Sequence, residues 1–268
     1  MKKILYTLLA IALPTAFFSE GKARTESIAA TSLEKSAAFN VGEVLEYRIH
    51  YGIVNAGRAK LNVSELTEHN GHPVYHMVGV GYTTGMTDLF FHVEDRYETY
   101  IDTQAWTPRR FIRDVDEGGF EIQRNIFFSP EEQEAVDYSF NPDSTFVLEE
   151  GIQDIFSMFY LARSVQVDQW TIGDIFTFPV FLDHEIYPMQ FEFLGREVID
   201  SDIGDIKCLA FKPSVQDGRV FSDEEGMTLY VSDDGNRIPI RIESELAVGS
   251  IKIDVTKAQN LAHPLAYE

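Results

Sequence analysis

The chain has 268 residues, with 22 Lys and Arg against 43 Asp and Glu, and a formal net charge of -21. This charge argues against a nucleic-acid binder, which needs a basic surface to displace counterions from phosphate groups. Hydrophobic residues (44%) and aromatic residues (13%) are too numerous for an acidic disordered chain. A chain of this length is therefore expected to fold around a sizeable core without disulfide staples.

Residues 1–23 have the pattern of a secretory signal peptide. Two lysines precede an apolar run over 4–18, and Gly21 and Ala23 supply small residues before a cleavage site after Ala23. A membrane anchor is the alternative, but the run is shorter than the roughly 20 residues of a spanning helix, and Pro14 interrupts it. We expect an exported protein without a stable membrane anchor, in the periplasm or alternatively outside the cell.

The segment that follows the cleavage site, residues 24–38, lacks a strand period and is rich in Ala and Ser. We expect it to be a flexible leader. Cleavage removes three lysines and one glutamate, which leaves 19 basic and 42 acidic residues and a net charge of -23. Such a charge favours solubility and opposes attachment to anionic lipid head groups.

Cys208 is the only cysteine of the chain. No intramolecular disulfide can form, and no cysteine near the signal is present for lipid attachment. Because Cys208 lies in a strand-like segment, we interpret it as a buried small hydrophobe rather than a nucleophile.

From residue 39 onward, apolar and polar residues alternate with a period of two. Clear examples are 45–51, 120–128 and 176–182, and turn sequences such as 69–73 separate such segments. We count about a dozen strands with mostly short connections. The pattern predicts a mainly β fold in one domain over residues 39–268, with a curved antiparallel sheet or a barrel-like body.

One segment near the centre of the chain, about 151–165, breaks this period. Ile152, Ile155, Phe156 and Phe159 follow the i, i+3, i+4, i+7 spacing of an amphipathic helix. We therefore predict one central helix between two β halves. The helix either plugs one end of the curved sheet or links two half-sheets.

Several local patterns occur in a fixed order: FNVGEVLEY at 39–47, YGIVNAGRA at 51–59, D-x-x-S-x-x-Y-x-x-R in the predicted helix, LYVSDD-x-x-RIP at 229–239, and GSI at 249–251. In this order they resemble the exported bacterial family catalogued as domain of unknown function 3108. The resemblance covers roughly residues 39–257. It implies an exported, mainly β protein, and it brings no activity, substrate or catalytic residue.

The most distinctive polar group of the chain is the row on the predicted helix, formed by Asp154, Ser157, Tyr160 and Arg163. Residues three apart drift slowly around a helix, so these side chains form an inclined row that is a candidate ligand-binding site. The alternative is that they cap and anchor the helix, because an acid near its start and a base near its end suit the helix dipole. No nucleophile elbow surrounds Ser157, so a serine hydrolase is unsupported.

We predict no metal and no cofactor. His69, His72 and His76 have a spacing that invites metal ligation, but a turn sequence separates them, so we interpret them as turn and surface residues. Acidic clusters, for example at 114–117 and 233–236, lack the spacing of a calcium loop.

Aromatic residues are the main remaining resource, with 20 Phe, 12 Tyr and 2 Trp. This number exceeds the need of a thin core, and Phe127 and Phe128 must point to opposite faces of a regular strand. A curved sheet with an apolar concave side and a helix as lid suits a lipid or another hydrophobic ligand. The leading prediction is a non-catalytic protein that binds a hydrophobic ligand or a protein partner in the cell envelope.

Two other functions stay open at this point. One is a hydrolase of envelope polymers whose site includes Asp154, Ser157, Tyr160 and Arg163. The other is a structural or assembly protein that acts through an exposed sheet edge. The location and lining of the largest cavity would separate these alternatives.

Overall fold

The structure is a computed structural model that describes residues 25–27, 38–165, 170–215, 226–246 and 248–268. The expected signal peptide and most of the expected leader lie outside these residues. Within these residues there are two helices, α1 (Gly85–Phe90) and α2 (Ile155–Ala162), and neither is long and apolar enough to cross a membrane. The strands are β1 (Thr25–Ser27), β2 (Val44–Tyr51), β3 (Val54–His69), β4 (His72–Thr83), β5 (Val93–Asp102), β6 (Pro108–Glu117), β7 (Phe120–Ser129), β8 (Glu134–Asp137), β9 (Thr145–Val147), β10 (Ile175–Leu182), β11 (Glu185–Ser201), β12 (Gly204–Val215), β13 (Met227–Ser232), β14 (Pro239–Glu245) and β15 (Ser250–Gln259).

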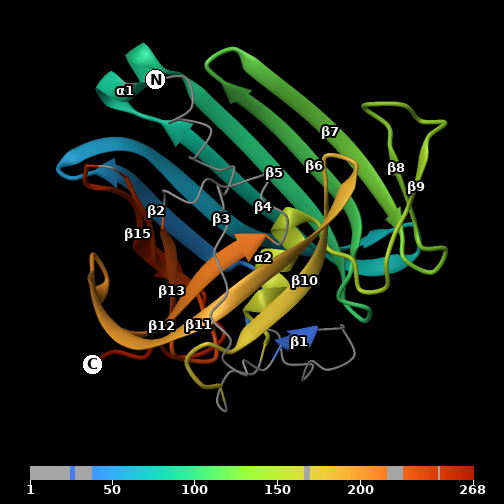
Figure 1. The fold of residues 1–268 in the computed structure, drawn as a ribbon. Helices are drawn as coiled ribbons and strands as arrows, with labels where there is room; N and C mark the ends of the chain where they lie inside the picture. Colours follow the sequence, from blue (N-terminus) through green and yellow to red (C-terminus); the bar gives the residue numbers. More distant parts are fainter. Residues whose placement is uncertain (1–24, 28–37, 166–169, 216–225, 247) are drawn as a thin grey trace.

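All strands belong to one sheet, in the order β1-β10-β11-β12-β13-β14-β15-β2-β3-β4-β5-β6-β7-β8-β9. Every neighbouring pair is antiparallel except β1 with β10. Among the described residues, the edge strands β1 and β9 do not pair with each other, so the sheet is open. Figure 1 shows the sheet curving around α2. The predicted mainly β fold with a curved antiparallel sheet is confirmed, and the barrel is not closed.

The curvature of the sheet comes from long strands that carry bulges. β11 has 17 residues, and its register with β12 shifts between Phe193 and Gly195, where Gly195 adopts a φ of +128°. A bulge bends its strand and increases the local twist. Because β11 and β12 bend in this way, the end of their hairpin comes to lie over β14 and β15.

Two apolar clusters form the interior. The larger cluster lies between the concave face of the sheet and α2, and it includes Phe111, Tyr160 and Phe178. The smaller cluster lies where the β11–β12 hairpin packs on its neighbours, and it includes Ile206 and Cys208. The larger cluster holds α2 against the concave face of the sheet. The smaller cluster holds the end of the β11–β12 hairpin against the neighbouring strands.

The predicted helix at about 151–165 is confirmed at its centre and is shorter at both ends, because α2 spans Ile155–Ala162. Gln153 forms a bridge to β10 instead of a helical turn: its N–H donates to the Pro179 carbonyl at 2.9 Å, and its own carbonyl accepts from Phe181 N–H at 2.8 Å. The helix therefore begins only after Asp154.

Two elements were not predicted. α1 has six residues and no buried residue, too few for a recognisable apolar stripe. β1 lies within the segment expected to be a leader, where it pairs in parallel with β10. Backbone hydrogen bonds to a neighbouring strand explain how a segment without an apolar period can still be extended.

Candidate functional site

The N-terminus of α2 is built by Asp154 and Ser157. Asp154 Oδ1 accepts hydrogen bonds from the N–H groups of Phe156 and Ser157, both at 2.7 Å, and Ser157 Oγ accepts from Asp154 N–H at 2.9 Å. Thr99 Oγ1 on β5 donates to Asp154 Oδ2 at 2.7 Å. Burial raises the pKa of Asp154 to about 6. The two residues form a capping box that fixes the helix to β5.

The C-terminal end of α2 is held by Arg163. Its guanidinium makes a bidentate ion pair with Glu43, with nitrogen–oxygen distances of 2.7 and 2.8 Å. It also donates to the carbonyls of Asn236 at 2.9 Å and Ala38 at 3.0 Å. Arg163 thus joins three parts of the chain that are distant in sequence.

Tyr160 is fully buried between these two ends. The rings of Phe39, Phe156 and Phe159 surround it edge to face, at centroid distances of 5.2 to 5.5 Å. The Arg163 guanidinium lies 5.5 Å from the centre of the Tyr160 ring. Burial raises the pKa of Tyr160, so its hydroxyl is protonated at neutral pH.

All four residues of the predicted polar row are therefore buried. Asp154 and Ser157 cap α2 and Arg163 pairs with Glu43, while the Tyr160 hydroxyl has no hydrogen-bond partner among the described residues. Only Arg163 also borders the cavity that lies beside the helix. A ligand-binding role for Asp154, Ser157, Tyr160 and Arg163 stays a prediction.

An apolar cavity of about 230 Å³ lies between α2 and the concave face of the sheet. Inward-facing strand residues such as Ile49, Leu61 and Ile242 form one wall, and Phe159 of α2 forms another. Among its described lining residues only two are charged, and both are arginines: Arg163 and Arg237. In a chain with about twice as many acids as bases, a lining without carboxylates disfavours cationic ligands.

The distance between α2 and β4 depends on Gly79. A Cβ atom at this position would lie 2.9 Å from Phe156 Cζ and 3.1 Å from a methyl carbon of Leu61. The missing side chain therefore allows the Phe156 ring to lie directly on the strand.

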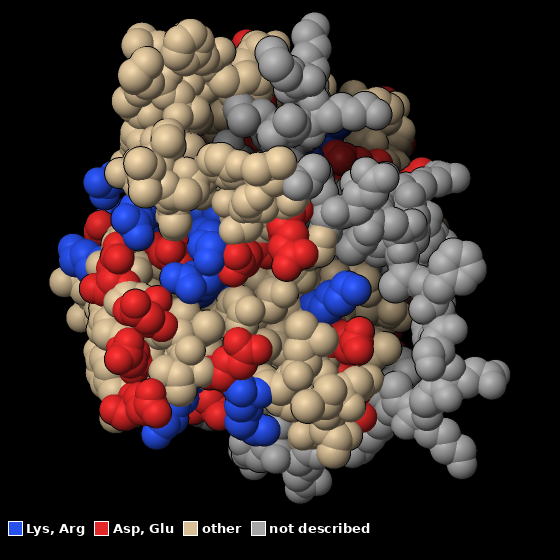
Figure 2. Space-filling model, turned by 60° about the vertical axis from the view of Figure 1, so that its left-hand side comes forward, with Lys and Arg blue, Asp and Glu red and all other residues tan. Residues whose placement is uncertain are grey.

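Exposed apolar residues gather at the end of the sheet that is formed by the β2–β3 turn and α1. Ile53 in the β2–β3 turn is 100% exposed, and Met86, Leu89 and Phe90 of α1 are 72 to 83% exposed. β2, β3 and β4 bring these residues to one end of the sheet, because β2 turns into β3 there and β4 ends there. Figure 2 shows few charged side chains at the top of the molecule, the end that carries α1 in Figure 1. We call Ile53, Met86, Leu89 and Phe90 the apolar rim.

The three histidines with metal-like spacing have other partners. His69 and His72 flank the tight turn at 70–71, as predicted, and His76 Nε2 lies 2.7 Å from a carboxylate oxygen of Glu98. The part of the chain that the structure describes holds no cluster of three metal-ligating side chains.

Cys208 is fully buried in β12. Burial raises the pKa of its thiol to about 12, so the thiol is protonated at neutral pH. The interpretation of Cys208 as a buried small hydrophobe is confirmed.

The cavity lining was not predicted, because it is spread over many strands. Glu43 was not predicted as the partner of Arg163. A signal for that pair was present, because Glu43 lies in the FNVGEVLEY pattern and Arg163 in the helix pattern, and both patterns belong to the same resemblance.

Comparison with protein families identifies the family of this chain. The model of the family described as "Protein of unknown function (DUF3108)" matches residues 46–256. The chain belongs to the DUF3108 family. This match confirms the resemblance, and it covers all strands from β3 to β14 together with α2. The comparison with curated proteins finds no match.

One solved structure has the same type of fold. A β-barrel-like protein of domain of unknown function DUF1849 from Brucella abortus is 12% identical, with a TM-score of 0.55, and the alignment covers 83% of this chain and 99% of that one. At this identity the likeness concerns the fold alone. Two weaker matches are a candidate lipoprotein from Parabacteroides distasonis (12% identity, TM-score 0.37, 83% and 98% coverage) and a candidate exported protein with a YmcC-like fold from Bacteroides fragilis (11% identity, TM-score 0.34, 84% and 100% coverage).

Proposed function

We propose that this member of DUF3108 is an exported, non-catalytic protein that binds a hydrophobic ligand, such as a lipid or an acyl chain, between α2 and the sheet. The observation that carries the proposal is the apolar cavity of about 230 Å³. Natural ligand sites are concave, mostly apolar and largely preformed. None of its described lining residues is acidic, and the charge of Arg163 is balanced by Glu43, so the cavity suits a ligand whose buried part is uncharged.

The apolar rim supports a route for the ligand. Large exposed apolar patches on soluble proteins mark sites of contact with membranes or partners. A lipid that leaves a bilayer at the rim would meet the exposed side chains of Ile53, Met86, Leu89 and Phe90 before it reaches the cavity. The net charge of the chain opposes adsorption to anionic head groups, so contact with a membrane is apolar and transient.

Native mass spectrometry of the protein purified from its own cell envelope tests the proposal. We expect a bound lipid-sized mass that disappears when Ala59→Phe fills the cavity. Lys60→Phe is the matched control, because it adds the same ring at the next residue of β3, where the side chain is exposed and points away from the cavity. Recovery without any bound lipid, or equal lipid in both variants, would contradict the proposal.

The two alternative functions receive less support. The hydrolase would use Asp154 and Ser157, whose polar groups are occupied by the cap of α2. The assembly role would use a sheet edge, yet the two edge strands, β1 and β9, each have three residues in the described chain. Such short edges offer little template for another strand.

A further inference from the structure

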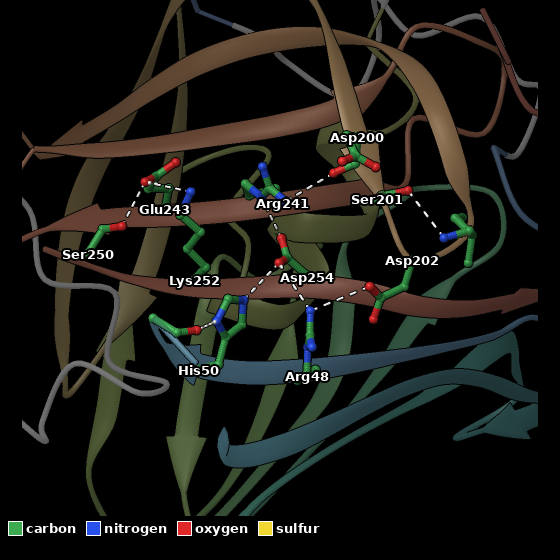
Figure 3. Close-up of polar contacts among 12 residues, drawn as sticks. Arg48, His50, Asp200, Ser201, Asp202, Arg241, Glu243, Ser250, Lys252 and Asp254 are labelled. Carbon is green, nitrogen blue, oxygen red and sulfur yellow. Dashed lines mark hydrogen bonds and ion pairs between the residues drawn. The ribbon is translucent and has the colours of Figure 1, made fainter. Parts of the chain in front are cut away.

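A second pocket, of about 630 Å³, lies on the convex face of the sheet. Its floor consists of β2, β14 and β15, whose alternate residues line the apolar cavity on the other face. Its roof is the end of the β11–β12 hairpin, with Asp200, Ser201 and Asp202. Figure 3 shows the hairpin end above the polar side chains of the three strands.

The floor is an ordered network around Asp254, which is only 3% exposed. One carboxylate oxygen accepts from Arg241 Nε at 2.5 Å, and the other lies 2.8 Å from His50 Nε2 and 3.9 Å from an Arg48 nitrogen. Arg48 and Arg241 are the direct cross-strand neighbours of Asp254. Lys252 is paired with Glu243 on the same floor, at 3.0 Å. The floor is therefore rigid before any ligand binds.

The charges of the lining are separated between floor and roof. The floor contributes Arg48, Arg241 and Lys252 against two carboxylates, Asp254 and the Glu243 that pairs with Lys252, while the roof contributes only the carboxylates of Asp200 and Asp202. Counted without His50, the formal charges are +1 on the floor and -2 on the roof, so the pocket is basic on its floor and acidic at its roof. A ligand that matches it carries a negative group at one end and a positive group at the other.

Two contacts join roof and floor. An Arg241 nitrogen donates to the Asp200 carbonyl at 3.1 Å, and Arg48 Nη2 lies 3.4 Å from Asp202 Oδ1. The side chains of Arg48 and Asp202 are 37% and 44% exposed, so solvent screens their pair and it contributes little. A ligand can therefore separate this pair at small cost.

We propose that this pocket binds a small zwitterion with an oxyanion and a primary ammonium group. The phosphate or carboxylate oxygens lie on Arg48 and Lys252 of the floor, and the ammonium group lies under Asp202 of the roof. The ligand replaces the long Arg48–Asp202 contact by two shorter charge-assisted ones. The buried contacts of Asp254 remain as they are.

Isothermal titration calorimetry with defined probes tests this site. Glycerophosphoethanolamine supplies phosphate and ammonium, and alanine supplies carboxylate and ammonium, so the two probes distinguish the two sources of the oxyanion. Inorganic phosphate supplies only negative charge, and ethanolamine supplies only positive charge. We expect saturable binding of at least one zwitterion, at least about tenfold tighter than binding of either of these two probes. No saturable binding of either zwitterion up to roughly 10 mM would overturn the proposal.

Variants of the lining residues test the proposal by the direction in which the affinity for each probe changes. Asp202→Asn is expected to weaken zwitterion binding about tenfold and to strengthen binding of inorganic phosphate, because it removes a carboxylate that attracts ammonium and repels an anion. Arg48→Gln is expected to weaken both. Arg196→Gln, which breaks a similarly exposed pair with Asp233 away from the pocket, is the control and changes neither. If Asp202→Asn strengthens binding of both zwitterions as well as of inorganic phosphate, the pocket is a simple anion site and the zwitterion assignment is wrong.

Discussion

Arg163 and Glu43 form a bidentate ion pair that ties the end of α2 to the chain just before β2. Their side chains are 2% and 1% exposed, and the two nitrogen–oxygen distances are 2.7 and 2.8 Å. A buried charge without its partner is far more costly than the pair itself. The pair therefore holds the helix at one place against the sheet, which keeps the cavity beside it open.

Loss of this pair is expected to destabilise the protein strongly. Glu43→Gln leaves the Arg163 guanidinium buried without a counter-charge, and we expect a loss of about 3–5 kcal/mol in the free energy of unfolding. Equilibrium unfolding in urea measures it. The control is Glu46→Gln on β2, which breaks an exposed pair with Lys257 and is expected to cost less than about 1 kcal/mol. Equal costs for the two variants would show that the buried pair does not anchor α2.

The cap of α2 gives a second stability prediction. Asp154→Ala removes the acceptor of two backbone N–H groups and of the Thr99 hydroxyl, and we expect a loss of about 2–3 kcal/mol at neutral pH. Asp154→Asn keeps an acceptor for the helix N–H groups and is expected to cost less than about 1 kcal/mol. Thermal unfolding of both variants shows whether Asp154 stabilises the protein as a hydrogen-bond acceptor at the helix N-terminus or through its negative charge.

Asp95 on β5 predicts how stability depends on pH. Burial, with Glu117 as a second cause, raises the pKa of Asp95 to about 7 from an ordinary value near 3.8. Because the folded-state pKa is raised, the contribution of Asp95 to the free energy of unfolding is fully present below pH 3.8. This contribution is lost as the pH rises to about 7. Asp154, whose pKa is raised to about 6, acts in the same direction.

Asp95→Asn is therefore expected to stabilise the protein above pH 7 and to flatten this decline. The gain has an upper limit of about 4 kcal/mol, because each pKa unit corresponds to about 1.36 kcal/mol. Urea unfolding between pH 4 and 8 in one buffer series measures it. A parent protein whose stability is independent of pH over this range, or a variant with an unchanged slope, would contradict the prediction.

The apolar rim predicts an effect on function without an effect on folding. Leu89→Ser and Phe90→Ser remove side chains that are 82% and 83% exposed, so the free energy of unfolding should stay within about 0.5 kcal/mol of the parent. Transfer of a fluorescent fatty acid from neutral vesicles to the protein should slow several-fold. Val147→Ser, on the edge strand β9 with 79% exposure, is the matched control and should transfer at the parent rate. Unchanged transfer in the rim variants would remove the rim from the proposed route.

Much of the fold was predictable because it is encoded locally. Leu45, Tyr47 and Ile49 alternate with polar residues. Because side chains in a strand point alternately to its two faces, the sequence predicts the buried face of β2 directly. The apolar face of α2 is predicted in the same way, from apolar residues that recur with a period of 3.6 residues. The short α1, with no buried residue, has no such pattern and could not be found.

The sites depended on contacts that no local pattern contains. Ile49 and Ile253 face the same cavity as direct neighbours across β2 and β15, and Arg48 and Asp254 are neighbours on the opposite face. The sequence alone determined the class of fold, the family resemblance and the acidic character of the chain, because these follow from composition, order and period. Only the tertiary structure decided that the sheet stays open, where the apolar cavity lies and how the charges of the convex pocket separate. Each of these depends on which distant strands pair, and strand pairing is set by the bends and register of the whole sheet rather than by any one segment.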